Sequence, residues 1–214
     1  AAHWNDRMQG LAMAIRGLPI PVIAMVHGYC VGGGHELALW CDLVISAEDG
    51  VFGQTGARVG ACPTVGATQY IPRLIGDRLA KEMIFLCRTF KAEEAVQIGL
   101  INRCVPKAQL RKETEAWCEQ IKSYSSQTIR QTKKSLNHES DQLYASWQHG
   151  MELLAHVWGS EESLEGMNAF LEKRKPDFMK FRQANKREVA GYLRGLDRDE
   201  NEAPKKAKKA RKKK

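Results

Sequence analysis

The sequence predicts an α/β fold in which short strands alternate with helices, followed by a region that is helical throughout. A β-branched apolar run from Val22 to Val26 gives way to a glycine cluster and then to HELALWC, which is typical of a buried helix. From residue 107 onward the apolar spacing is helical only. We therefore expect an α/β core over residues 1–106, a helical C-terminal region suited to oligomerisation over 107–182, and a polar, then Lys-rich tail over 183–214.

Each expected element has a local signal. Apolar residues at helical spacing, including Met8, Leu11 and Ile15, predict a first helix that ends before Pro19. Gly99 is a typical stop for the helix that precedes it. Strands are expected over 22–26, 43–46, 51–52 and 100–105, and further helices over 66–75, 77–86, 92–98, 107–122, 126–138, 141–158 and 160–173.

Composition predicts a soluble, cytoplasmic protein. The 214 residues are 43% hydrophobic, enough for one substantial core. No apolar run approaches the ~20 residues of a membrane helix, and no signal peptide is visible. The six cysteines form no C-x-x-C pair, so we expect reduced thiols and no metal site.

The net charge of +8 belongs to the tail. Residues 205–214 hold eight of the 33 basic residues and no acid, so the other 25 bases balance all 25 acids. Such a tail is suited to binding nucleic acid through phosphate neutralisation, and a solubilising extension is the alternative. The body carries no nucleic-acid-binding motif, so nucleic acid is expected as a partner only through this tail.

The three consecutive glycines Gly32, Gly33 and Gly34 are the strongest candidate site. A glycine bend that opens a helix exposes backbone N–H groups, which attract anions or an oxyanion. A dinucleotide fingerprint needs glycine where Leu37 stands, and a zinc-protease motif needs histidine where Leu39 stands. The remaining alternative is a tight packing turn without chemistry.

Longer motifs resemble a known family. One long motif is PVIAMVHGYCVGGGHELALWCDLVISAEDGVFGQTGARVG, and it is followed by GATQYIPRLIG, AEEAVQIGLINRCVP and EGMNAFLEKRKPDF. Together these motifs resemble the crotonase (enoyl-CoA hydratase/isomerase) superfamily. The resemblance implies a crotonase-type ββα spiral core, N-terminally truncated because family members carry a further stretch before this point. It also implies an acyl-CoA thioester as substrate, no cofactor apart from that coenzyme A, and a homotrimer or dimer of trimers.

The resemblance assigns roles to particular residues. The Gly33 N–H corresponds to half of the oxyanion hole for the thioester carbonyl, and Glu36 to one of two catalytic glutamates. The substrate-binding positions are Gly28, Tyr29, Gly32, Gly56, Val59, Pro63 and Thr64. Lys173 and Lys175 correspond to basic residues that reach a coenzyme A phosphate, with a solvated helix end as the alternative.

Gly56 stands where hydratases carry their second glutamate. Glycine there is usual in the 1,4-dihydroxy-2-naphthoyl-CoA synthase branch and in ring-cleaving oxoacyl-CoA hydrolases, which the chain resembles most. The chain departs from the pattern of the naphthoyl-CoA synthases at Glu36, Pro63 and Trp158. We expect a hydratase-like enzyme, a lyase or hydrolase, for a cyclic or unsaturated acyl-CoA. The alternatives are a ring-cleaving hydrolase, a naphthoate-synthase-like C–C lyase, or a noncatalytic CoA-ester-binding or interaction subunit.

Overall fold

The computed structural model describes residues 2–182, and the tail predicted over 183–214 lies outside the described residues. The chain starts with helix α1 (Ala2–Gly17), which ends before the proline-containing linker. Strand β1 (Ile23–Val26) follows, then strand β2 (Tyr29–Val31) and helix α2 (Gly33–Trp40). Two short strands followed by a helix make one turn of a ββα spiral.

The next turn repeats this pattern and lies beside the first. Strand β3 (Leu43–Ala47) pairs in parallel with β1, and β4 (Val51–Gly53) pairs in parallel with β2. The 3₁₀ turn η1 (Gly56–Val59) and helices α3 (Ala67–Ile75) and α4 (Asp77–Phe85) follow. The two strands of each turn therefore belong to different sheets.

Three short elements complete these sheets. Strand β5 (Thr89–Lys91) pairs antiparallel with β4, which gives one sheet the order β2-β4-β5. Helix α5 (Ala92–Gln97) leads to β6 (Arg103–Val105), which is parallel to β3 and gives the other sheet the order β1-β3-β6.

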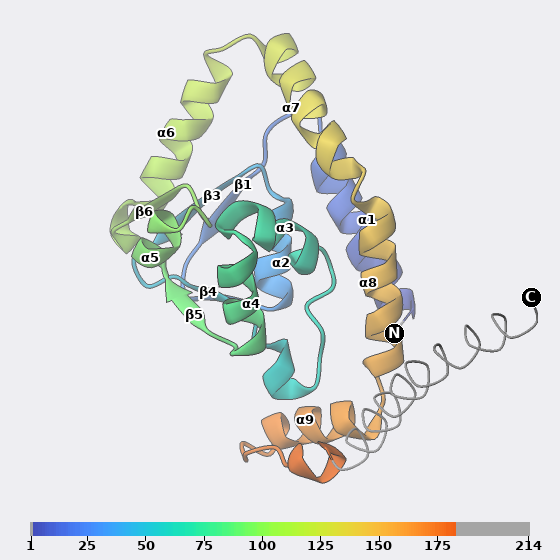
Figure 1. The fold of residues 1–214 in the computed structure, drawn as a ribbon. Helices are drawn as coiled ribbons and strands as arrows, with labels where there is room; N and C mark the ends of the chain where they lie inside the picture. Colours follow the sequence, from blue (N-terminus) through green and yellow to red (C-terminus); the bar gives the residue numbers. More distant parts are fainter. Residues whose placement is uncertain (1, 183–214) are drawn as a thin grey trace, which may run out of the picture.

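The remaining described chain is helical, as predicted. After the 3₁₀ turn η2 (Lys107–Gln109) come α6 (Leu110–Lys122), α7 (Ser126–Asp141), α8 (Tyr144–Val157) and α9 (Glu161–Leu171). Helices α6 and α7 form an arch over the sheets, and α9 lies below η1 (Figure 1). Helix α8 runs beside α1, against which it packs in one buried cluster. No helix in the described part is long and apolar enough to cross a membrane.

Two aromatic residues join the α/β core to the helical region. Trp40 of α2 and Trp147 of α8 lie with their ring centroids 5.7 Å apart, and both are buried. Ala12 of α1 and Val65, in the loop before α3, belong to the same buried cluster. The loop before α3 is therefore held between α2 and α8.

A buried lysine fixes α7 to the first turn of the spiral. The Lys133 ammonium, in a residue that is 6% exposed, donates to the carbonyls of Ile15 and Ile20 at 3.1 and 2.9 Å. It also pairs with the Asp42 carboxylate at 2.7 Å, and that carboxylate accepts from the Val22 amide at 2.7 Å. All three of its N–H groups thus have acceptors, which is what a buried ammonium requires.

The sequence prediction of the elements is confirmed in outline and wrong in detail. The expected strands and helices are present, with bounds that differ by a few residues. Strands β2 and β5 were not predicted. The expected strand over 100–105 is only Arg103–Val105, because the residues before it turn back from α5: the amides of Leu100 and Ile101 both donate to the Ala95 carbonyl.

Candidate active site

The triglycine bend connects β2 to α2. Gly32 adopts φ 55° and ψ −126°, a conformation that requires glycine. Its amide donates to the Gly53 carbonyl at 3.0 Å, and its carbonyl accepts from the Glu36 amide at 2.9 Å. The end of β4 on one side and the first turn of α2 on the other therefore fix the bend.

The amides that follow this bend are available to a ligand. Gly33 and Gly34 open α2, where N–H groups have no acceptor within the helix, and among the described residues neither amide has a hydrogen-bond acceptor. Both glycines are exposed, and a Cβ placed on either meets no atom within 4 Å. The bend thus presents free donors and the positive end of a helix to open space.

Glu36 lies one turn into α2 and is 4% exposed. Its Oε1 accepts from the Val65 amide at 2.8 Å, and a further backbone hydrogen bond comes from Ala67, at the N-terminus of α3. Burial raises the pKa of this carboxyl to about 7, against the two amides, which lower it. A carboxyl of this kind exchanges its proton near neutral pH.

Gly56, at the predicted position of the second carboxylate, has a packing reason to be glycine. It opens η1, and its carbonyl accepts from the Ala61 amide at 2.9 Å. A Cβ at this position would lie 2.6 Å from the Ala61 carbonyl oxygen. No side chain fits without movement of the backbone, so the local structure excludes a glutamate here.

The other predicted substrate-binding residues lie in two places: at the end of η1 and in the loop before α3, and at the beginning of β2. Thr64 is buried beside Val65, its Oγ1 has no partner among residues 2–182, and Pro63 before it is half-buried. Val59, at the end of η1, is also half-buried. Gly28 and Tyr29 lie at the start of β2, where the Gly28 amide donates to Asp49 and Tyr29 is 83% exposed.

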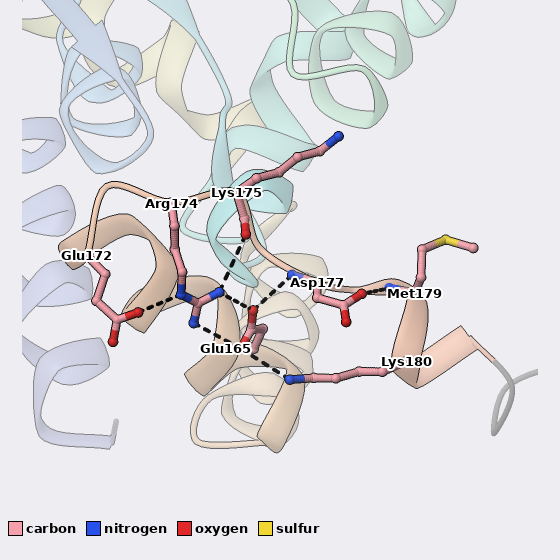
Figure 2. A network of polar contacts seen from close by, with 7 residues as sticks. All are labelled: Glu165, Glu172, Arg174, Lys175, Asp177, Met179 and Lys180. Atoms are coloured by element: carbon pink, nitrogen blue, oxygen red, sulfur yellow. Dashed lines mark hydrogen bonds and ion pairs between the residues drawn. The ribbon is translucent and has the colours of Figure 1, made fainter.

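The predicted coenzyme A phosphate residues follow α9. Lys173 and Lys175 are exposed, and Arg174 between them is held by ion pairs with Glu165 and Glu172 (Figure 2). In Figure 2 the Lys175 side chain extends away from this network, whereas the Arg174 guanidinium lies within it. The Arg174 guanidinium is therefore committed to this network, and the Lys175 ammonium lies outside it.

Glu165 organises this segment. Its carboxylate accepts from Arg174 at 2.6 Å, from the Asp177 amide at 2.9 Å and from Lys180 at 3.2 Å. The Arg174 hydrogen bond, followed by that of the Asp177 amide, lowers the pKa of Glu165 to about 2. It stays ionised across the physiological range, which keeps the chain after α9 folded back onto that helix.

Sequence reasoning missed Val65, whose amide holds the Glu36 carboxylate. The two residues are 29 positions apart, and only the pairing of the spiral turns brings them together. The signal available in the sequence was an apolar residue directly before Gly66, the glycine that precedes α3.

A sequence model described as enoyl-CoA hydratase/isomerase matches residues 1–182. The chain belongs to this family. Its matching region therefore includes the triglycine bend, Glu36, Gly56 and the segment after α9.

Solved structures of this family have the same fold. An enoyl-CoA hydratase from Mycobacterium avium subsp. paratuberculosis is 27% identical with a TM-score of 0.78, over 81% of this chain and 71% of that protein. A carnitinyl-CoA hydratase from Mycobacterium avium is 29% identical with a TM-score of 0.72, over 75% of this chain and 63% of that protein. A methylmalonyl-CoA decarboxylase is 30% identical with a TM-score of 0.71, over 80% and 68%. The aligned part thus spans about two thirds of these proteins.

Proposed function

We propose that this protein is an acyl-CoA-processing enzyme of the hydratase type, in which the Gly33 amide polarises the thioester carbonyl and Glu36 transfers the proton. The observation that carries the proposal is the combination of open, unpaired amides with a buried carboxyl one turn along the same helix. Membership of the enoyl-CoA hydratase/isomerase family supports an acyl-CoA as the substrate.

The bend contributes charge stabilisation. As negative charge moves onto the thioester oxygen, the fixed Gly33 N–H and the N-terminus of α2 stabilise it without reorganising. A donor of this kind lowers a barrier by about 2.7–4 kcal/mol. Because the amide already faces open space, it can bind the substrate oxygen without first breaking a hydrogen bond within the protein.

Glu36 contributes the proton transfer. In the hydration direction, its carboxylate accepts a proton from the water that attacks the β-carbon of the enoyl group. The electron pair of the double bond moves to the thioester oxygen as an enolate. The Glu36 carboxyl then returns its proton to the α-carbon, and all atoms of the water are added. A pKa of about 7 suits a group that must both accept and release a proton.

Gly56 favours a second candidate reaction. Hydratases divide acid and base work between two carboxylates, and here the backbone of Ala61 excludes the second one. The second candidates are therefore ring-cleaving hydrolysis of a cyclic oxoacyl-CoA, for which Glu36 would be the single carboxyl, and C–C bond cleavage as in a naphthoate-synthase-like lyase, from whose pattern Glu36 departs. The methylmalonyl-CoA decarboxylase among the similar structures supports a family site adapted to C–C cleavage.

Turnover of a set of CoA thioesters tests the proposal. Crotonyl-CoA represents enoyl substrates, and a 2-oxocycloalkane-1-carboxyl-CoA, whose ring ketone is β to the thioester carbonyl, represents ring cleavage. We expect Glu36→Gln to lower kcat by at least about 100-fold on whichever ester the parent accepts, because proton transfer contributes about 10²–10⁴-fold. Glu161→Gln, an exposed acid in the first turn of α9, is the matched control and should leave kcat unchanged.

The outcomes separate the candidates. Loss of the enone absorbance of crotonyl-CoA supports hydration, and release of a ring-opened acid supports hydrolysis. Binding of every ester with no turnover by the parent would favour a noncatalytic CoA-ester-binding subunit. Unchanged turnover in Glu36→Gln would remove this residue from the mechanism.

A further inference from the structure

Two buried polar side chains lie directly behind the triglycine bend. His35 of α2 and Gln54, the residue after β4, are each 1% exposed. Gln54 Nε2 lies 3.4 Å from His35 Nδ1 and 3.5 Å from the Gly32 carbonyl oxygen. Neither side chain takes part in the proposed proton transfer or oxyanion binding, although both lie next to the residues that do.

The geometry of the peptide bond connects this pair to the oxyanion donor. The Gly32 carbonyl and the Gly33 N–H belong to one planar, trans peptide unit, so they point in opposite directions. Any group that fixes the direction of the Gly32 carbonyl therefore fixes the direction of the Gly33 N–H. The carbonyl has two donors near it, the Glu36 amide at 2.9 Å and Gln54 Nε2 at 3.5 Å.

A glycine that adopts positive φ has a wide range of alternatives, because it lacks the Cβ that limits other residues. The Glu36 amide alone anchors the carbonyl from within the helix. Gln54 anchors it from the neighbouring strand, whose Gly53 carbonyl also accepts from the Gly32 amide at 3.0 Å. The bend is thereby tied to β4 at both its amide and its carbonyl.

His35 in turn orients Gln54. The ring packs with its edge toward Phe52, with centroids 5.9 Å apart and an interplanar angle of 70°. Gln54 Nε2 can only donate, so this 3.4 Å contact is a hydrogen bond when the ring proton of His35 is on Nε2 and Nδ1 accepts. Burial lowers the pKa of His35 to about 4, against a hydrogen bond to the Gly53 backbone that raises it, so the ring is neutral at neutral pH and one of its nitrogens can accept.

The pair is also incompletely satisfied. Gln54 Oε1 is buried and has no hydrogen-bond partner among the described residues. An apolar side chain of similar length would fill this space without leaving a buried polar atom unpaired. Packing alone therefore gives no reason for glutamine here, whereas the Nε2 donor to the Gly32 carbonyl does.

We propose that Gln54 and His35 are positioning residues that hold the Gly32 carbonyl and so aim the Gly33 amide at the thioester oxygen. This inference rests on the proposed function for the identity of the oxyanion, and the hold on the bend is independent of any substrate. Neither side chain contacts the reacting atoms in this account.

The test compares Gln54→Met, which keeps the length of the side chain and removes the amide, with the parent chain. Ser46→Ala is the matched control, because it removes another buried hydrogen bond, from Ser46 Oγ to the Ala47 carbonyl at 2.9 Å, away from the bend. His35→Phe is a second variant, which keeps the aromatic contact and removes the ring nitrogens. ¹⁵N relaxation of the unliganded proteins reports the order of the Gly33 N–H.

We expect the order parameter of the Gly33 N–H to fall from about 0.85 in the parent and in Ser46→Ala toward about 0.6 in Gln54→Met and His35→Phe. With an accepted CoA thioester, kcat should fall about 10- to 100-fold with little change in KM, because the donor is displaced and the substrate still binds. The ¹⁵N shifts of His35 in the parent should show the Nε2–H tautomer, a readout that needs no variant.

The results distinguish the positioning role of Gln54 and His35 from the role of Gly33 as the oxyanion donor. An order parameter that is unchanged in both variants overturns the positioning role, whatever happens to kcat, as does an Nδ1–H tautomer in the parent. A loss of order with unchanged kcat supports the positioning role and contradicts Gly33 as the oxyanion donor, which is the proposed function. A loss of both supports the two together.

Discussion

The buried carboxyl of Glu36 should make the protein less stable as the pH rises. Burial moves the pKa of this group from 4.5 to about 7 in the folded protein, so the folded state binds its proton more tightly than the unfolded state does. Below pH 4.5 the group is protonated in both states and has no effect. Between pH 4.5 and 7 the unfolded state ionises first, and the free energy of unfolding falls.

The size of the effect follows from the shift. A displacement from 4.5 to about 7 corresponds to a loss of about 3 kcal/mol above pH 7, since each pKa unit is worth about 1.4 kcal/mol. Glu36→Gln keeps an acceptor for the Val65 amide and cannot ionise. The variant should therefore match the parent at pH 4 and exceed its stability by up to about 3 kcal/mol at pH 8.

Urea denaturation at several pH values measures this difference directly. The parent and Glu36→Gln should have the same m value, with midpoints that diverge as the pH rises from 4.5 to 7. Glu161→Gln, at an exposed position, should follow the parent at every pH. A stability difference that does not change with pH would show that the Glu36 carboxyl has an ordinary pKa and is not held as a proton-transfer group.

Three further changes test the supporting structure. Gly56→Ala should lower the free energy of unfolding by about 1–3 kcal/mol, measured with urea, because its Cβ would meet the Ala61 carbonyl oxygen at 2.6 Å; an unchanged midpoint would contradict this. Lys133→Met should cost about 3 kcal/mol, seen as a lower thermal midpoint, because it leaves the Asp42 carboxylate without its ammonium. Glu165→Gln should speed trypsin cleavage after α9, and cleavage at the parental rate would show that this carboxylate does not anchor the segment.

The elements with strong periodicity were predictable from the sequence. The strand predicted over 22–26 is present as β1 and the helix predicted at the three glycines is present as α2, because β-branched runs and buried helix patterns carry their own signal. Strands β2 and β5 have only three residues each, too few to show alternation. Their existence depends on pairing with β4, which local sequence does not encode.

The chemistry of the candidate site was predictable only in part. Gly33 lies within the glycine cluster and Glu36 follows it by two residues, so local sequence indicates both. The pKa of Glu36 depends on burial and on the Val65 amide, which come from tertiary packing. The positions of His35 and Gln54 behind the bend likewise depend on β4 lying beside β2.

The carbonyl stretching frequency of bound crotonyl-CoA tests the central claim most directly. Gly33→Pro removes the amide donor at the first position of α2, where proline is tolerated and a Cβ has room. The parent should shift the thioester carbonyl to lower frequency on binding, and Gly33→Pro should lose most of that shift and about 10²–10³-fold in kcat. The same shift and the same kcat in Gly33→Pro would contradict the account.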